Sequence, residues 1–228
     1  MSTVLDADTG SRLGWRICLA DLRDGGAAAR AAAAFLHAMI LPGSPVVRLG
    51  HRFMTEYYYR DLVEEGLLGA FVAWVDDQPA GFVAYTQRPH DFMVEGLRRH
   101  PLKIASLVGG AFLARPSRVL VVGRALGILK RRRDDLATGP AYDAEILSLG
   151  VLPQYRSPAF RRATGRHLGR ELFERAVERI RADGGRRVGT LVEARDLETA
   201  VFLHSLGCRF HREWVDGADC YEILYVVS

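Results

Sequence analysis

The hydrophobic positions of the chain fall into short apolar runs bounded by turn residues and into longer stretches with helical spacing. The short runs predict strands over 15–20, 70–75, 80–86, 145–152, 187–193, 209–215 and 220–227. The longer stretches predict helices over 27–40, 53–65, 165–183 and 197–206. This order predicts an α+β fold, in which helices flank a mixed, twisted sheet of six to seven strands.

Turn residues predict how several strands are joined. Asp76-Asp77-Gln78-Pro79 is typical of a hairpin, and Asp216-Gly217 predicts another near the end of the chain. Strand 145–152, helix 165–183 and strand 187–193 form a strand–helix–strand unit. Such a unit makes its two strands parallel through a right-handed crossover.

The segment 89–140 interrupts this order before the central strand. Its apolar spacing predicts two helices separated at Arg115-Pro116-Ser117, because proline ends a helix. Between Gly96 and Arg133 there are many basic residues and no acidic one. The basic residues are Arg98, Arg99, Lys103, Arg115, Arg118, Arg124, Lys130, Arg131, Arg132 and Arg133. We expect one domain over 1–228 with a basic helical insertion at about 89–140.

The sequence leaves three roles open for this insertion. Its helices cover the acceptor side of a site with a solvated basic face, or they bind an acidic partner such as an acyl-carrier protein, a nucleotide-linked sugar or a phosphorylated metabolite. In the third role, apolar helices beside the basic run at 130–133 make peripheral contact with an anionic membrane. Nucleic acid is not expected, because Phe112 is the one aromatic residue of the basic stretch.

Composition narrows the classes of protein further. The three cysteines, Cys18, Cys208 and Cys220, lack metal-ligand spacing, so we expect reduced thiols, a cytoplasmic protein and no metal. The start of the chain lacks a basic-then-apolar pattern, and no uninterrupted apolar run reaches about 18 residues. Neither a signal peptide nor a membrane-spanning helix is therefore expected.

Candidate catalytic and binding residues are most concentrated between residues 144 and 170. Glu145 is the one carboxylate of an apolar strand, and strict alternation places it on the same face as Leu147, Leu149 and Val151. Burial among apolar side chains raises the pKa of a carboxylate, which suits a base that accepts a proton from an ammonium group. The alternative is a solvated charge at the frayed start of the strand.

An arginine-rich loop follows this strand and leads into helix 165–183. The first turn of a helix has free N–H groups and a partial positive charge, so it binds phosphate. Arg161, Arg162 and Arg166 add positive charge at this helix start. The segment therefore combines a seat for a phosphorylated ligand with a proton acceptor.

This segment resembles the GNAT superfamily of N-acetyltransferases, and so does the element order outside the insertion. Three parts of the sequence match family motifs: Val151-Leu152-Pro153, Tyr155-Arg156 and the run 196–208. A fourth match is Ala144-Glu145-Ile146. In some members a general-base Glu precedes the valine by six residues, as Glu145 precedes Val151 here. It implies that acetyl-CoA lies between strands 145–152 and 187–193, with its pyrophosphate on the loop and helix start. Glu145 is then the catalytic base.

The family's loop pattern fits best on Arg162, Gly165 and His167, which implies a six-residue insertion containing Pro158. The tyrosine that often protonates the departing thiolate falls at Leu203, so His204 and Tyr221 are the candidates for that role. The donor-binding residues implied are Leu149, Gly150, Val151, Arg156, Arg162, Ala163, Thr164, Gly165, Arg166, His167, Leu168, Gly169 and Asp196.

The resemblance implies an N-acetyltransferase that moves an acetyl group from acetyl-CoA to an amine by direct attack, because no convincing nucleophile is visible. Two alternatives stay open: an acyltransferase for a longer acyl-CoA or a carrier-protein-bound substrate, and a non-catalytic CoA-binding protein. The acceptor is a small-molecule amine or an acidic or carrier-bound molecule, contacted by 41–65 and the insertion. Tyr57, Tyr58 and Tyr59 either line its pocket or pack in the core. The sequence determines neither the acceptor nor the oligomeric state.

Overall fold

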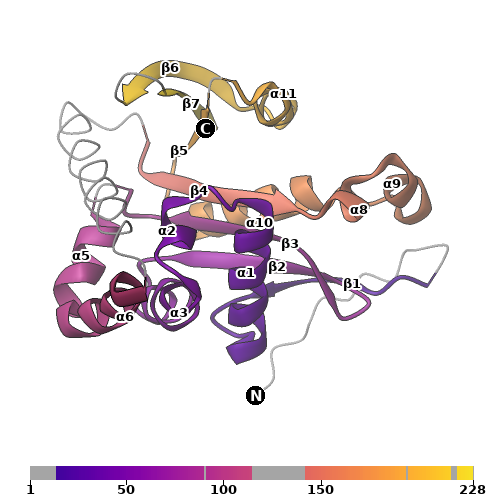
Figure 1. Cartoon of the computed structure of the whole chain (residues 1–228). Coiled ribbons are helices and arrows are strands. Elements are labelled where there is room, and N and C mark those ends of the chain that lie inside the picture. Colours follow the sequence, from indigo (N-terminus) through magenta and orange to yellow (C-terminus); the bar gives the residue numbers. More distant parts are fainter. Residues whose placement is uncertain (1–13, 90, 115–141, 194, 217–219, 228) are drawn as a thin grey trace.

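The structure, a computed structural model, describes residues 14–89, 91–114, 142–193, 195–216 and 220–227 (Figure 1). Seven strands form one sheet in the order β1-β2-β3-β4-β5-β7-β6. They are β1 (Ile17–Asp21), β2 (Gly69–Val75), β3 (Gln78–Thr86), β4 (Ala144–Val151), β5 (Val188–Glu193), β6 (Arg209–Asp216) and β7 (Cys220–Val227). All neighbours are antiparallel except β4 and β5, so the predicted mixed sheet is confirmed.

Helices cover both faces of this sheet (Figure 1). One face carries α1 (Gly26–Ile40), α2 (Pro45–Arg48), α3 (His51–Phe53), the π-helix η1 (Met54–Tyr58), α4 (Asp61–Glu64), α5 (Phe92–Arg99) and α6 (Pro101–Ala114). The other face carries α10 (Leu168–Ala182) and α11 (Leu197–Ser205). Two short helices, α8 (Pro153–Arg156) and α9 (Pro158–Thr164), join β4 to α10.

The two main helices bury different kinds of face. On α1 the buried residues are mostly alanines, including Ala29, Ala32 and Ala33, whose small side chains let the helix approach the sheet. On α10 the buried positions recur with helical spacing, from Leu172 to Ile180, while its charged residues face solvent. Both helices were predicted from these patterns, and both are confirmed.

The single helix predicted over 53–65 is wrong. The segment instead forms α3, the π-turn η1 and α4, and a Tyr59 N–H bond of 2.9 Å to the Met54 carbonyl closes the wider turn. Three successive large rings, Tyr57, Tyr58 and Tyr59, are all buried here. A π-turn spreads such rings more widely than a regular α-helix does.

The described part of the insertion belongs to the core. The first predicted helix is divided at His100 into α5 and α6, while the predicted break at Arg115-Pro116-Ser117 and the second helix lie outside the described residues. Phe92 and Ile104 join the core on the α1 side. At Gly96 a Cβ would lie 2.4 Å from the Tyr57 hydroxyl, so α5 packs against η1 more closely than any larger residue allows.

The basic residues of α5 and α6 mostly find partners within the chain. Lys103 bonds to the buried Asp61 at 2.5 Å, and Arg99 bonds to Glu95 at 2.9 Å. The other basic residues of the insertion, apart from Arg98, lie outside the described residues.

Within the described residues, no helix is long and apolar enough to cross a membrane.

Candidate functional site

The parallel strands β4 and β5 separate soon after they begin. They pair only from Ala144 to Ile146, opposite Val188 to Thr190. Thr190 ends the pairing by donating from Oγ1 to the Ile146 carbonyl at 3.0 Å. Beyond this point β4 follows β3 and β5 follows β7, so the two strands diverge toward their carboxyl ends (Figure 1).

A β-bulge in β4 accompanies this separation. Along β3, Tyr85 pairs with Ile146 and Ala84 pairs with Ser148, so Leu147 is an extra residue of β4. An extra residue inverts the alternation of every side chain that follows it. The bulge therefore decides which residues of β4 face α1 and which face α10.

The bulge corrects the predicted surroundings of Glu145. Leu149 and Val151 pack in the core on the α10 side, not beside the carboxylate. Glu145 shares the α1 side with Leu147 and with Gly150, where a Cβ would meet α1. The prediction of one face for all four strand residues is wrong beyond Leu147, because strict alternation cannot anticipate a bulge.

Glu145 itself is buried, with 2% of its surface exposed. It pairs with Thr86 of β3 and with Gly189 of β5, well inside the sheet. The solvated-charge alternative is therefore wrong. The Tyr58 phenol lies close by: burial, together with the charge of Glu145, raises the pKa of Tyr58, which keeps the phenol protonated.

A second polar group on this face joins α1 to the tyrosines. His37 Nδ1 lies 2.8 Å from the Tyr59 hydroxyl, and His37 Nε2 lies 3.1 Å from the Ser44 hydroxyl. The ring stacks on Phe82, and burial lowers the pKa of His37 to about 4. These contacts give His37 a structural role in the core. The Ser148 hydroxyl, beside Tyr59, is buried without a hydrogen-bond partner among the described residues.

The open edge of β4 carries unpaired backbone groups. The Leu152 N–H donates to the Ala80 carbonyl at 2.8 Å. This bond shows which residues of β4 direct their backbone groups toward β3. In an antiparallel ladder the backbone groups of successive residues point to opposite sides. Those of Gly150 therefore point to β3, and those of Leu149 and Val151 point to the gap beside β5.

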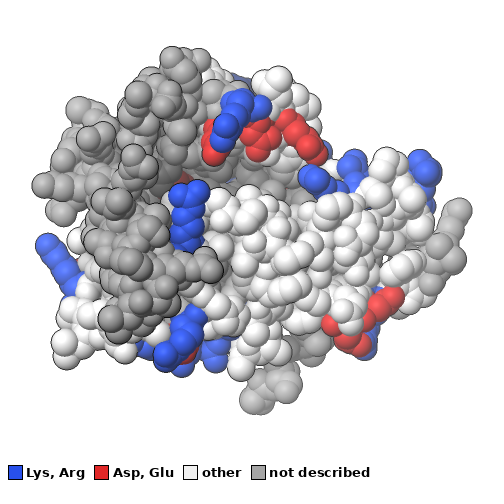
Figure 2. Space-filling model, viewed as in Figure 1, with Lys and Arg blue, Asp and Glu red and all other residues white. Residues whose placement is uncertain are grey.

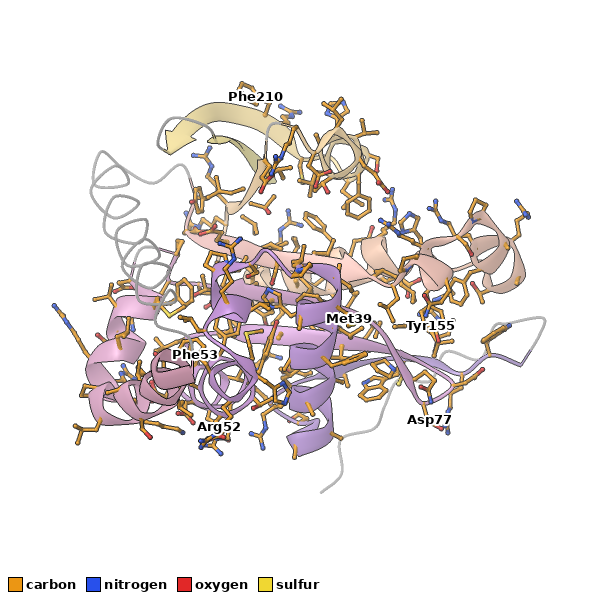
Figure 3. All side chains as sticks on the ribbon, viewed as in Figure 1. Met39, Arg52, Phe53, Asp77, Tyr155 and Phe210 are labelled. Atoms are coloured by element: carbon orange, nitrogen blue, oxygen red, sulfur yellow. The ribbon has the colours of Figure 1, made fainter. Side chains whose placement is uncertain are left out.

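Part of the arginine-rich loop, including Pro158, forms the short helix α9. Ser157 caps α9, Gly165 ends it in the left-handed region at a φ of 70°, and Phe160 packs on Tyr155 (Figure 3). Ala163 and Thr164 lie in the last turn of α9, where N–H groups bond within the helix. Gly165 thus serves a helix end rather than a close approach to a ligand.

The start of α10 is largely capped by its own residues. His167 Nδ1 accepts from the Arg170 N–H at 3.3 Å, and Glu171 accepts from the His167 N–H at 3.1 Å. Burial and the nearby Arg161 lower the pKa of His167, whose ring stacks on Phe202 of α11. Of the predicted donor-binding N–H groups, those of Leu168 and Gly169 stand in the first turn with no acceptor assigned among the described residues.

The arginines of the loop differ in their partners. Arg166 forms a bidentate ion pair with Glu171, the shortest contact being 2.6 Å, and Arg161 donates to the Arg156 carbonyl at 2.8 Å. The Arg156 side chain reaches across to Glu198 of α11 at 3.3 Å. Arg162 is exposed and has no ion pair within the described residues. It is therefore the arginine left available for a phosphate.

The candidate residues of the run 196–208 differ in burial and in their contacts. Asp196 caps α11, because its carboxylate accepts from the Thr199 N–H at 3.0 Å and from the Thr199 hydroxyl at 2.7 Å. Leu203 is buried, and His204 is exposed on α11. The side chain of Tyr221, on β7, lies outside the described residues.

Cys208 is buried, and burial raises the pKa of its thiol to about 11, so it stays neutral and unreactive. No group of three or more His, Cys, Asp or Glu residues in the described part of the chain is arranged to hold a metal ion.

The surface around the diverging strands is hollowed (Figure 2). Charged side chains of both signs gather on the rim beside α11, and the central face over α1 is largely uncharged. Two large apolar residues are exposed in this view, Met39 on α1 and Phe210 at the outer edge of β6 (Figure 3).

Sequence reasoning missed Thr190 and the placement of the three tyrosines relative to Glu145. Thr190 has no sequence signal, since its role depends on where two strands part. Only the fold shows that Tyr57, Tyr58 and Tyr59 are buried on the same side of the sheet as Glu145.

Comparison with solved structures identifies the fold. A GNAT-family acetyltransferase from Streptococcus pneumoniae is similar, with a TM-score of 0.50, 14% identity, and coverage of 93% of this chain and 98% of that one. Arabidopsis thaliana NAA60, in complex with acetyl-CoA, has a TM-score of 0.52, 14% identity, and coverage of 92% and 97%. A Drosophila melanogaster polyamine N-acetyltransferase has a TM-score of 0.51, 17% identity, and coverage of 92% and 99%.

No family model matches the sequence, and a search of curated proteins finds no match. The structural likeness nevertheless extends over nearly the whole of each chain. The chain therefore has the GNAT fold.

Proposed function

We propose that this protein is an N-acetyltransferase that moves an acetyl group from acetyl-CoA to an amine. The observation that carries the proposal is the open edge of β4, where the backbone groups of Leu149 and Val151 point into the gap beside β5. An extended pantetheine chain pairs with such an edge as a further strand would. Two of the similar structures are a complex with acetyl-CoA and a polyamine acetyltransferase, which supports this donor and an amine acceptor.

Glu145 accepts the proton that the amine loses, directly or through a water molecule. The amine nitrogen attacks the thioester carbonyl, the new C–N bond forms, and the C–S bond breaks to release the CoA thiolate. A backbone N–H on the open edge of β4 stabilises the oxyanion that develops at the carbonyl. Among the described side chains, His204 remains the candidate that returns a proton to the thiolate.

The donor phosphates lie at the start of α10. The phosphates are bound by the N–H groups of Leu168 and Gly169 and by the guanidinium of Arg162. The other arginines of the loop keep their partners in the chain, and Gly150 and Asp196 shape the site through packing and helix capping.

Replacing the base tests this proposal. Glu145→Gln lowers kcat about a hundredfold or more, the usual contribution of general base catalysis, and leaves the affinity for acetyl-CoA nearly unchanged. Thiol release with a panel of amines measures turnover, and calorimetry measures donor affinity. Glu178→Gln, on the exposed face of α10, is the matched control and retains full activity.

The calorimetry also separates the alternatives. Tighter binding of longer acyl-CoAs favours a long-chain acyltransferase, and tight binding of CoA without thiol release favours a non-catalytic protein. If none of these donors binds, the proposal fails.

A further inference from the structure

Two Ser-Pro pairs begin short helices in this chain, and their serines use the hydroxyl differently. Ser44 precedes Pro45 at the start of α2, and Ser157 precedes Pro158 at the start of α9. Their backbones are nearly the same, with φ and ψ of −56° and 134° at Ser44 and of −64° and 149° at Ser157. The Ser157 hydroxyl caps α9 by accepting from the Phe160 N–H at 3.2 Å. The Ser44 side chain makes no such bond to α2, a helix that the structure describes completely.

The Ser44 hydroxyl instead contacts the buried ring of His37 on α1. His37 Nε2 lies 3.1 Å from the Ser44 oxygen, and His37 Nδ1 lies 2.8 Å from the Tyr59 hydroxyl. The ring is 1% exposed, so Nε2 would lose the partner that the described residues give it if Ser44 turned to cap α2. An unpartnered buried nitrogen usually costs more than a cap at a half-buried serine contributes. The hydroxyl therefore serves His37 rather than the start of its own helix.

This contact ties the segment 41–50 to α1. The helix α2 has four residues, so it is too short to be stable without tertiary contacts. Its Arg48 N–H donates to the Ser44 carbonyl at 3.2 Å, a bond that lies inside the segment. The apolar side chains of α2 are only partly buried. The position of the segment therefore depends on the hydrogen bond between Ser44 and His37, which we call the tether.

The segment begins beside the open edge of β4. Ile40, the last residue of α1, packs on Gly150, where a Cβ would lie 2.6 Å from the Ile40 side chain. Gly150 stands between Leu149 and Val151, whose backbone groups point into the gap. The proposed base lies on the same side of the sheet as α1. An amine that reaches both the base and a thioester in the gap therefore passes this segment.

We propose that Ser44 is a positioning residue for the amine acceptor: its hydroxyl, bonded to His37, holds the segment 41–50 in place as a wall on the acceptor side of the site. The inference rests on the proposed function for its catalytic meaning. The tether itself involves neither donor nor acceptor, so it can be tested in the free protein.

The first test is hydrogen exchange over α2. Ser44→Ala removes the tether and takes no cap from α2. We expect the Arg48 and Gly50 amides to exchange about threefold to tenfold faster, the effect of losing one hydrogen bond. Ser44→Thr keeps a hydroxyl at this position and retains the slow exchange. Ser157→Ala is the matched control, because it removes the hydroxyl of the other Ser-Pro pair and leaves exchange over 46–50 unchanged.

Thermal unfolding confirms that each variant is folded before exchange is compared. Unchanged exchange over 46–50 in Ser44→Ala overturns the inference. An equal acceleration in Ser157→Ala also overturns it, because the effect then belongs to any lost hydroxyl rather than to the tether.

The second test separates the acceptor from the donor, with the amine of highest turnover in the panel as the probe. In Ser44→Ala this amine must order a looser segment when it binds, so its KM rises about twofold to tenfold. The Kd of acetyl-CoA and kcat stay near their wild-type values, and Ser44→Thr restores the KM.

Faster exchange beside an unchanged KM of the amine shows that the segment does not position the acceptor, and it overturns the inference. Faster exchange in a protein that shows no turnover with any amine upholds the tether and rejects the proposed function.

Discussion

At the residue scale, His37 is the polar residue on the buried face of α1. Its two ring nitrogens contact the hydroxyls of Tyr59 and Ser44, and its ring stacks on Phe82 with centroids 5.0 Å apart. One nitrogen of a neutral imidazole donates and the other accepts, so both contacts suit the uncharged ring. Protonation places an unpaired charge in the core.

This arrangement predicts a stability that depends on pH. The pKa of His37 is lowered to about 4, below the ordinary value of 6.5, so the unfolded chain binds the proton more tightly. Stability is therefore complete above pH 6.5 and is lost as the pH falls toward 4, by about 3 kcal/mol at most. Urea unfolding of the wild type and His37→Gln at pH 7 and pH 4 measures this loss. The same loss in both proteins contradicts the prediction.

At the element scale, two irregular turns build the site. The bulge at Leu147 turns Leu149 and Val151 away from α1, and the turn around η1 places Tyr57, Tyr58 and Tyr59 in the core on the α1 side. Both features interrupt otherwise regular elements, as such features often do near functional sites. The insertion supports the π-turn from outside through α5.

The packing of α5 on η1 gives a prediction for Gly96. Glycine to alanine usually stabilises a helix by about 1 kcal/mol. Here the new Cβ would lie 2.4 Å from the Tyr57 hydroxyl and 2.5 Å from Leu62. We expect Gly96→Ala to destabilise the protein by about 1–3 kcal/mol, because overpacking outweighs helix propensity.

Thermal unfolding measures this change, and adding Tyr57→Phe restores part of the loss by removing the hydroxyl. An alanine variant as stable as the wild type shows instead that α5 moves freely away from η1.

At the scale of the whole molecule, the sheet has two parts, which pair with each other only at the start of β4 and β5 and share the apolar core on the α10 side. The part ending in β4 carries α1 and the tyrosines, and the part beginning with β5 carries β7, β6 and α11 (Figure 1). Contacts across the gap include Arg156 to Glu198 and Arg170 to the Ser205 carbonyl. Arg156 is exposed and Arg170 is partly exposed, and such surface contacts hold two parts together weakly.

This division predicts where a bound donor protects the backbone. The amide hydrogens of Leu149 and Val151 exchange quickly in the free protein and slowly with acetyl-CoA, because the donor pairs with the open edge of β4. The Gly150 amide points to β3 and is protected in both states. Hydrogen exchange followed by NMR resolves the three residues, and equal protection of Leu149 with and without the donor contradicts this binding mode.

The sequence by itself determined the order of elements, the mixed sheet, the two amphipathic main helices and the segment that carries Glu145. These follow from local spacing and turn residues, which a single chain displays directly. Only the tertiary structure decided the face on which Glu145 lies, the burial of the three successive tyrosines and the local structure of the arginine-rich loop. The bulge at Leu147 depends on pairing with β3, and the contacts of the loop arginines depend on Glu171 and Glu198. Such contacts join residues far apart in the chain or inside a folded turn, where sequence spacing carries no information about distance.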